Sequence, residues 1–245
     1  MKGFDCAIPL TAAQAKALAN AGMMFAARYL VPENLAWKRL TRAEAEAITG
    51  AGMQIVSVFE TTASRAASGE AAGRTDGAAA LRQAKLIGQP QGSAIYFAVD
   101  YDAQPAAYRS IEEYLRAADA QITGYKSGVY GSYAVVEEMA RRGACEHFWQ
   151  TYAWSRGEQS AHANLYQYRN GVTVAGVLLD LNDSFGNEGW WSTRKEEEPG
   201  MTKADAEKII SFLSAGWFVA KTKTDKAEFQ RLANEIRKSA GMPTE

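Results

Sequence analysis

The sequence predicts an α/β fold, a modified TIM-type (β/α) barrel followed by a small C-terminal helical hairpin. Eight short apolar runs with strand character recur along the first 192 residues, and Ala-rich amphipathic stretches separate the earlier runs. A charged stretch that ends in Pro-Gly then precedes a tail of different composition. We therefore divide the chain into a barrel (1–192), a linker (193–201) and a helical tail (202–245).

The strand-like runs are rich in apolar residues and are bounded by polar or glycine-containing segments. They cover residues 3–8, 24–30, 54–60, 94–100, 127–132, 147–153, 164–169 and 176–181. Many are nearly continuous apolar runs, as expected for strands that are buried on both faces. A doubly wound open sheet would explain the first five units almost as well as a barrel.

Helical patterns lie between these runs. They are centred on residues 11–21, 41–51, 75–88, 104–123 and 132–143. The stretches between the last three strands are too short for full helices, so we expect the later βα repeats to be incomplete. The fold is then a compact variant of the barrel.

The tail has the pattern of two short helices. Thr202 is a suitable N-cap with Asp205 three residues later, Thr222–Asp225 interrupts the pattern, and Gly241 ends it. Such a pair buries little of its own apolar stripe, so it must pack on the barrel, on a second copy or on a target. The tail carries eight Lys and Arg against six Asp and Glu, whereas the rest of the chain carries 19 against 22.

Composition excludes several classes of protein. The chain has 245 residues, 47% of them hydrophobic, and a net charge of −1, so it is neither disordered nor a dedicated nucleic-acid binder. It has no apolar run long enough for a membrane-spanning helix. Two cysteines and two histidines are too few for a disulfide framework or the usual zinc sites. Residues 1–8 lack the pattern of a signal peptide, so we expect synthesis in the cytoplasm.

Polar side chains cluster where the predicted strands end. In a barrel of this kind, the carboxyl ends of the strands form the mouth that holds the active site. The candidate catalytic carboxyl groups are Asp5, Glu60, Asp100, Asp102 and Asp180. The candidate substrate-binding residues are Arg28, Tyr29, Tyr101, Tyr130, Gln150, Tyr152, Gln167 and Tyr168.

This combination of side chains is suited to sugars. Aromatic faces pack on the C–H surfaces of a sugar, and carboxylates and amides bind its hydroxyl groups. Glycosidic bonds are cleaved by a carboxylic acid together with a second carboxylate or a group on the substrate. Asp100 and Asp102 share one face if the strand stays regular. The alternative is structural: Asp5 and Asp180 as buried carboxylates bonded to backbone or to Arg28, Asp102 as a helix cap, and the aromatic residues as packing.

Five segments together resemble a known family. They are GFD (3–5), FAVDYD (97–102), GVYGSY (128–133), FWQTYAW (148–154) and LYQYRNGVTVAGVLLDLND (165–183). Their order is similar to that in glycoside-hydrolase-like domain family 1906 (Rv2525c-like), a relative of the family 25 lysozymes, which are N-acetylmuramidases. The resemblance covers residues 2–192 and does not extend to the tail.

The resemblance implies a modified barrel, a peptidoglycan-like substrate and no metal or other cofactor. Asp5, Asp100 and Asp180 match the acidic positions of lysozyme strands one, four and eight, and Gln167 and Tyr168 match the Gln-Tyr of strand seven. The general acid of the lysozymes is the Glu of an Asp-x-Glu motif. Asp102 stands at that position here, one methylene shorter, so Glu60 is the alternative acid.

Two hypotheses follow. The first is an endolysin-type muramidase that cleaves the glycan strand of the bacterial cell wall and reaches it after release from the cell. The second is a barrel that binds glycan without cleaving it, whose acidic cluster only holds sugar. In both, the expected partner is the peptidoglycan glycan strand, with a cell-wall polymer as a further partner of the tail and no nucleic acid.

Overall fold

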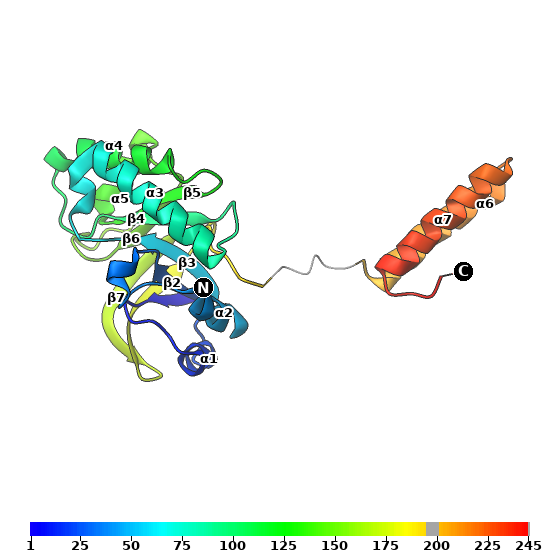
Figure 1. Ribbon diagram of the computed structural model, residues 1–245, viewed down its shortest axis with the longest axis horizontal. Coiled ribbons are helices and arrows are strands. Elements are labelled where there is room, and N and C mark those ends of the chain that lie inside the picture. The colour runs from blue at the N-terminus through cyan, green and yellow to red at the C-terminus, as the bar shows by residue number, and fades with distance from the viewer. Residues whose placement is uncertain (195–200, 245) are drawn as a thin grey trace. The chain divides into compact units, whose positions relative to one another are not determined.

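The computed structural model describes residues 1–194 and 201–244. The chain forms two compact units, Met1–Arg194 and Lys195–Glu245 (Figure 1). Most of the linker expected at 193–201 falls on residues 195–200, outside the described part. Each unit is described by itself.

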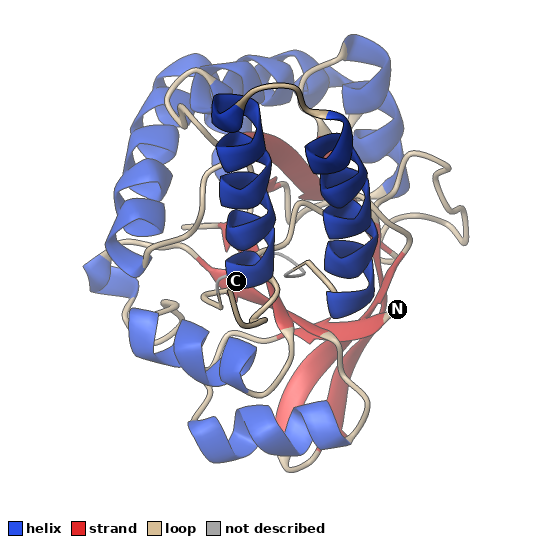
Figure 2. Ribbon diagram, turned by 90° about the vertical axis from the view of Figure 1, so that its right-hand side faces the viewer, coloured by secondary structure: helices blue, strands red, loops and turns tan. Residues whose placement is uncertain are grey.

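The first unit is a closed eight-stranded barrel in the order β1 to β8, which confirms the predicted fold class. Its strands are β1 (Lys2–Asp5), β2 (Phe25–Tyr29), β3 (Gln54–Phe59), β4 (Ala94–Ala98), β5 (Lys126–Gly131), β6 (His147–Thr151), β7 (Leu165–Val174) and β8 (Val177–Ser184). Its helices are α1 (Ala12–Asn20), α2 (Arg42–Gly50), α3 (Gly69–Ile87), α4 (Tyr108–Asp119) and α5 (Tyr133–Arg142), with short 3₁₀ turns η1 (Glu33–Leu35), η2 (Arg65–Ser68) and η3 (Pro105–Ala107). Figure 2 shows the strands in red with the helices in blue around them.

The last strand runs against the others. Neighbouring strands from β1 to β7 are parallel, whereas β8 is antiparallel to both β7 and β1. No helix lies between β6 and β7 or between β7 and β8 within this described unit, as the short connections predict. The idea that Asp180 reaches the mouth from the carboxyl end of its strand is therefore wrong. Asp180 lies at the mouth because it pairs in register with Asp5, the last residue of β1.

Two apolar layers position the side chains of each strand. The inner layer fills the barrel and includes Phe25, Ala27 and Trp149. The outer layer lies between strands and helices and includes Phe4 and Ala26. Because side chains alternate along a strand, each strand sends one set of residues to the barrel interior and the other set to the helices.

Local sequence signals fix the helix boundaries. Thr11 forms a capping box with Gln14 at the start of α1, and Ser132 caps α5 by accepting from the amide of Val135. Helices α3 and α4 approach closely because Gly73 and Gly77 face the α4 backbone, where a Cβ atom would collide with the carbonyl groups of Tyr114 and Ala118.

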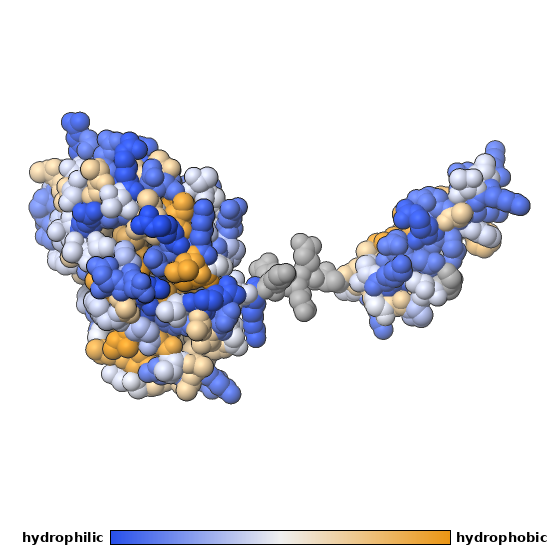
Figure 3. Space-filling view, viewed as in Figure 1, coloured by the Kyte–Doolittle hydropathy of each residue, from blue (hydrophilic) through white to orange (hydrophobic). Residues whose placement is uncertain are grey.

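The second unit is a helical hairpin of α6 (Lys203–Val219) and α7 (Lys223–Ser239). Thr202 caps α6 by accepting from the amide of Asp205, as predicted, and Thr222 caps α7 in the same way. Phe212, Phe218 and Val219 remain 77–80% exposed. Among the described residues, no helix is both long and apolar enough to cross a membrane. The hairpin surface in Figure 3 mixes hydrophilic blue with smaller hydrophobic orange areas.

Candidate active site

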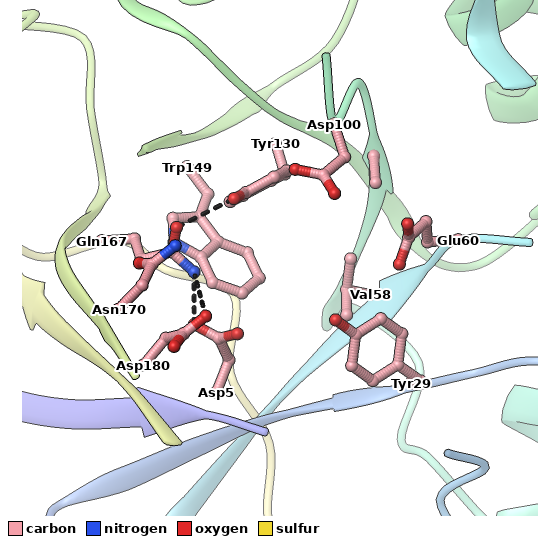
Figure 4. A pocket seen from close by; sticks show the side chains of 11 residues that line it. Asp5, Tyr29, Val58, Glu60, Asp100, Tyr130, Trp149, Gln167, Asn170 and Asp180 are labelled. Atoms are coloured by element: carbon pink, nitrogen blue, oxygen red, sulfur yellow. Dashed lines mark hydrogen bonds between the residues drawn. The ribbon is translucent and has the colours of Figure 1, made fainter. Parts of the chain in front are cut away.

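A pocket opens at the carboxyl ends of the parallel strands. It holds about 450 Å³ of empty space, counting the part open to solvent. Its lining comes from all eight strands or the residues directly after them: Asp5, Tyr29, Val58, Glu60, Ala98, Asp100, Tyr130, Trp149, Gln167, Asn170 and Asp180. Figure 4 shows Asp5 and Asp180 together below Gln167, with Glu60 and Tyr29 facing them across the pocket. Four carboxyl groups therefore share one small polar cavity.

Gln167 joins the two carboxyl groups on the floor of the pocket. Its Nε2 donates to Asp5 Oδ2 at 2.8 Å and to Asp180 Oδ2 at 3.5 Å. Its Oε1 accepts from Tyr130 Oη at 2.9 Å and from Thr151 Oγ1 at 2.8 Å. Because both ends of the amide are bonded, Gln167 has one orientation, and that orientation presents a donor to both carboxylates.

A second chain of bonds reaches Asp5 from the barrel interior. Trp149 Nε1 donates to Asn182 Oδ1 at 2.8 Å, and Asn182 Nδ2 donates to Asp5 Oδ2 at 2.7 Å. Asp5 is 6% exposed and Asn182 is fully buried. One carboxyl oxygen of Asp5 is thus fixed by two amide donors, and Oδ1 is left to face the pocket. On the other carboxyl group, Asp180 Oδ1 accepts from the amide of Gly171 at 2.8 Å.

The opposite wall carries Glu60 and a lysine. Lys38 Nζ donates to Glu60 Oε2 at 3.0 Å and lies 4.5 Å from the centre of the Tyr29 ring. Lys38 is 6% exposed, so the ammonium group is held between the carboxylate and the ring face. This wall is a preorganised ion pair next to Asp100.

Three of the four carboxyl groups bind protons more tightly than usual. Burial and, after it, the Asp180 charge raise the pKa of Asp5 to about 7, although the hydrogen bonds from Asn182 and Gln167 oppose the shift. Burial and then the Glu60 charge raise the pKa of Asp100, while Lys38 opposes this. Burial also raises the pKa of Asp180. A raised pKa favours the protonated form of a carboxyl group, and this is the form that general acid catalysis requires.

The structure brings seven of the sequence-predicted site residues into this pocket. They are Asp5, Tyr29, Glu60, Asp100, Tyr130, Gln167 and Asp180. The remaining predicted residues, Arg28, Tyr101, Asp102, Gln150, Tyr152 and Tyr168, do not line it. Tyr101 packs against the outer apolar layer, and Tyr152 is 43% exposed. Tyr168 is half-buried. Burial raises the pKa of its hydroxyl group, and the nearby charge of Asp183 raises that pKa further.

Asp102 lies in a different place from the one that strand alternation predicts. Strand β4 ends at Ala98, so the regular alternation that would place Asp100 and Asp102 on one face does not continue to these residues. Asp102 is exposed and lines a separate groove. The helix-cap alternative is also wrong, because the N-cap of η3 is Gln104 and no side chain caps it.

Arg28 and Gln150 have structural partners. The Arg28 guanidinium group is fully buried, donates from Nε to Glu44 Oε1 at 2.7 Å and contacts the carbonyl oxygen of Cys6. The structural alternative had Asp5 or Asp180 bonded to Arg28. This is wrong, because Arg28 pairs with Glu44 instead. Gln150 is fully buried, donates to the carbonyl of Glu158 and accepts from the amide of Ser160. Both side chains point out of the barrel, because they alternate with the inward-facing Tyr29 and Trp149.

Several residues of this site were not among the sequence-predicted ones. Trp149 and Asn170 line the pocket, Thr151 holds Gln167, and Lys38 holds Glu60. Trp149 and Thr151 alternate with Gln150 along β6, and the sequence of this strand does not show which of the two sets faces the interior. The described residues contain no group of three His, Cys, Asp or Glu side chains arranged to hold a metal ion.

Comparison with known proteins places this barrel among glycoside hydrolase-like domains. The Tat-secreted protein Rv2525c of Mycobacterium tuberculosis, solved with L-tartrate, is 25% identical with a TM-score of 0.69, over 78% of this chain and 98% of that one. GHIP, a glycosyl hydrolase 25 of Streptococcus pneumoniae, is 14% identical with a TM-score of 0.56, over 77% and 89%. A muramidase of Trichobolus zukalii is 15% identical with a TM-score of 0.50, over 76% and 94%. No curated protein matches the sequence.

The family comparison agrees with the structures. Residues 16–184 match the family described as Rv2525c-like, glycoside hydrolase-like domain, and this range covers most of the barrel and more than half of the chain. The chain therefore belongs to the family of Rv2525c-like, glycoside hydrolase-like domains.

Proposed function

We propose that this protein is a lysozyme-like peptidoglycan hydrolase that cleaves the glycan strand of the bacterial cell wall. One observation carries the proposal: Asp5, Glu60, Asp100 and Asp180 line a single pocket at the barrel mouth, and three of them have raised pKa values. Cleavage of a glycosidic bond needs both a protonated and an ionised carboxyl group, or a substrate group in place of the second. This pocket places three carboxyl groups with raised pKa values beside Glu60, which pairs with Lys38.

Asp100 is the proton donor in this proposal. Glu60 and Asp100 lie close enough for the Glu60 charge to raise the pKa of Asp100, and Lys38 compensates the charge of Glu60 at 3.0 Å. We therefore assign the transferred proton to Asp100, which passes it to the glycosidic oxygen as the bond to the anomeric carbon breaks. Glu60 takes no part in the proton transfer, and its charge raises the pKa of Asp100.

The floor of the pocket orients the sugar. Asp5 and Asp180 are linked through Gln167, and all three present polar atoms to the space that a 2-acetamido sugar would fill. In a substrate-assisted reaction, the acetamido oxygen attacks the anomeric carbon, and a carboxylate stabilises the positive charge that develops on the amide. Asp180 takes that role. Water then attacks the anomeric carbon of the cyclic intermediate formed by the acetamido oxygen, and its proton passes to Asp100.

Peptidoglycan is the substrate that best fits the relatives and the side chains. Muramidases share this fold, as does the catalytic domain of the endolysin Ply40 from a Listeria phage, with a TM-score of 0.50 and 13% identity. Tyr29, Tyr130 and Trp149 supply aromatic surface within the pocket. We assign the exposed apolar side chains of the α6–α7 hairpin to binding of a wall polymer, which suits an endolysin-type protein that acts after release from the cell.

The test is release of reducing ends from purified peptidoglycan by the full chain. Asp100→Asn is expected to abolish release, whereas Asp102→Asn should leave most of it, because Asp102 lies outside the pocket. Loss with Asp102→Asn and retention with Asp100→Asn would restore the lysozyme assignment of the acid. Wall binding without release by the wild type would establish the alternative, a non-catalytic glycan-binding barrel, which the exposed position of Asp102 favours.

A further inference from the structure

A second groove lies on the same face of the barrel as the pocket. It holds about 950 Å³ of empty space, counting the part open to solvent. Its chemistry comes from Asp102, Tyr108, Tyr133, Trp154, Arg156 and Glu158. These residues belong to the segments that follow β4, β5 and β6, so the groove stands at the carboxyl ends of three parallel strands.

Two residues of the segment after β6, Trp154 and Arg156, line this groove and have unfavourable backbone dihedral angles. Trp154 has φ 55° and Arg156 has φ 53°, both in the left-handed region that disfavours such residues. Between them, Ser155 Oγ accepts from the amide of Tyr133 at 2.9 Å, and Gln150 binds the carbonyl of Glu158 at 2.8 Å. The buried Ser155 and Gln150 thus hold the turn in place, and Trp154 stays 43% exposed.

The groove is lined by side chains of both charges that form no ion pairs among the described residues. Arg156, Asp102 and Glu158 are exposed, and none of them forms an ion pair with any residue in the described ranges. Helix α5 begins at the groove wall with Tyr133, has no acidic residue in its first turn, and favours an anion there. A ligand with both a carboxylate and an ammonium group would satisfy this arrangement, and a neutral sugar would not need the cation.

We propose that this groove binds the stem peptide of peptidoglycan. Arg156 and the start of α5 receive a peptide carboxylate, Asp102 and Glu158 receive the ammonium group of a diamino residue, and the Trp154 ring packs on its aliphatic chain. The inference rests on the proposed function, since the peptide is attached to the sugar strand that the pocket cleaves. It gives Asp102 a role in recognition in place of general acid catalysis.

Binding of a free stem peptide tests the groove independently of hydrolysis. Isothermal titration with the tetrapeptide L-alanyl-γ-D-glutamyl-L-lysyl-D-alanine should show binding to the full chain, about tenfold weaker for Arg156→Gln and for Trp154→Gly. Glycine relieves the backbone strain at position 154, so this variant keeps the fold. Arg74→Gln, which removes an exposed arginine of α3, is the matched control and should bind as the wild type does.

Kinetics separate the peptide from the sugar. The wild type should have a lower KM for glycan that carries stem peptides than for glycan stripped of them, and Arg156→Gln should remove this preference with kcat on stripped glycan unchanged. Equal loss on both substrates would make the groove a sugar subsite and overturn the inference, as would absence of peptide binding by the wild type. Peptide binding without any hydrolysis would leave the inference standing and reject the hydrolase proposal.

Discussion

Gln167 donates from Nε2 to Asp5 Oδ2 at 2.8 Å, although the two residues are 162 positions apart. This bond joins β7 to β1 across the interior of the barrel mouth, and the other end of the same amide is bonded to Tyr130 and Thr151. Through this one amide, the orientation of Asp5 depends on β5, β6 and β7, in addition to the bond from Asn182 of β8. Gln167 acts as a positioning residue for the carboxyl groups of the floor.

Replacement of Gln167 should damage catalysis more than stability. Gln167→Ala frees Asp5 and Asp180 to rotate, and we expect kcat for peptidoglycan cleavage to fall about 100-fold because misplaced groups lose their alignment. Reducing-end release and thermal unfolding measure the two effects. Gln91→Ala, an exposed glutamine before β4 at the opposite end of the barrel, should change neither. Unchanged kcat in Gln167→Ala would reject the positioning role.

Removing either of two charges near Asp100, that of Glu60 or that of Lys38, should shift the alkaline fall of kcat/KM in opposite directions. Glu60→Gln removes a negative neighbour, which lowers the pKa of Asp100, so kcat/KM should begin to fall at lower pH than in the wild type. Lys38→Met removes a positive neighbour and should shift the fall to higher pH. Cleavage of a soluble glycan across the pH range measures both. A limb near pH 7 that neither variant moves would identify Asp5 as the proton donor instead.

Much of the fold was predictable because apolar runs and their spacing are local features of the sequence. The eight strands and five helices of the barrel all overlap the predicted ranges, although α3 begins six residues earlier and β7 extends five residues further than predicted. The direction of β8 was not predictable from its apolar pattern, because that pattern is the same for a strand running either way. Pairing with β1 and β7 decides it, and places Asp180 beside Asp5.

The candidate site was predictable where a single polar residue interrupts an apolar strand, as at Asp5. The site was not predictable where polar residues occupy both the odd and the even positions of a strand, because either set could then face the interior. In β6, Trp149 and Thr151 face the interior and Gln150 faces outward, yet a shift of one residue would fit the sequence equally well. Lys38 lies outside the strands, and only the tertiary fold brings it to Glu60.

Arg28 should contribute to stability without contributing to substrate binding. Arg28→Met leaves the buried carboxylate of Glu44 without its partner, so the free energy of unfolding should fall by about 3–5 kcal/mol. Urea denaturation measures the loss. The exposed pair Arg42–Glu46 is the matched control, and Arg42→Met should cost less than about 1 kcal/mol. A raised KM in Arg28→Met with unchanged stability would restore its predicted role in substrate binding.

The exposed aromatic residues of α6 should govern binding to whole cell walls. Phe212 and Phe218 are 80% and 77% exposed, and exposed apolar surface of this kind marks an interaction site. Phe212→Ser with Phe218→Ser should weaken co-sedimentation with walls about tenfold, with cleavage of soluble glycan unchanged. Lys208→Ser on the same helix is the control. Loss of a dimer in gel filtration, with wall binding intact, would assign the surface to self-association.

Asp5 should make the protein less stable as the pH rises. Its pKa is about 7 in the folded protein against 3.8 for an ordinary aspartate, so between these values the folded state keeps a proton that the unfolded state releases. Stability from this group is therefore complete below about pH 4 and is lost as the pH approaches 7. Asp5→Asn mimics the protonated form and can still accept from Gln167 and Asn182.

The advantage of Asp5→Asn over the wild type should accordingly grow with pH, reaching about 4 kcal/mol at neutral pH in urea denaturation. Asp180→Asn should show the same sign, because burial raises the pKa of Asp180 as well. A difference that is independent of pH would contradict the raised pKa of Asp5. Loss of peptidoglycan cleavage in the more stable variant would show that the barrel keeps a destabilising carboxyl group for its chemistry.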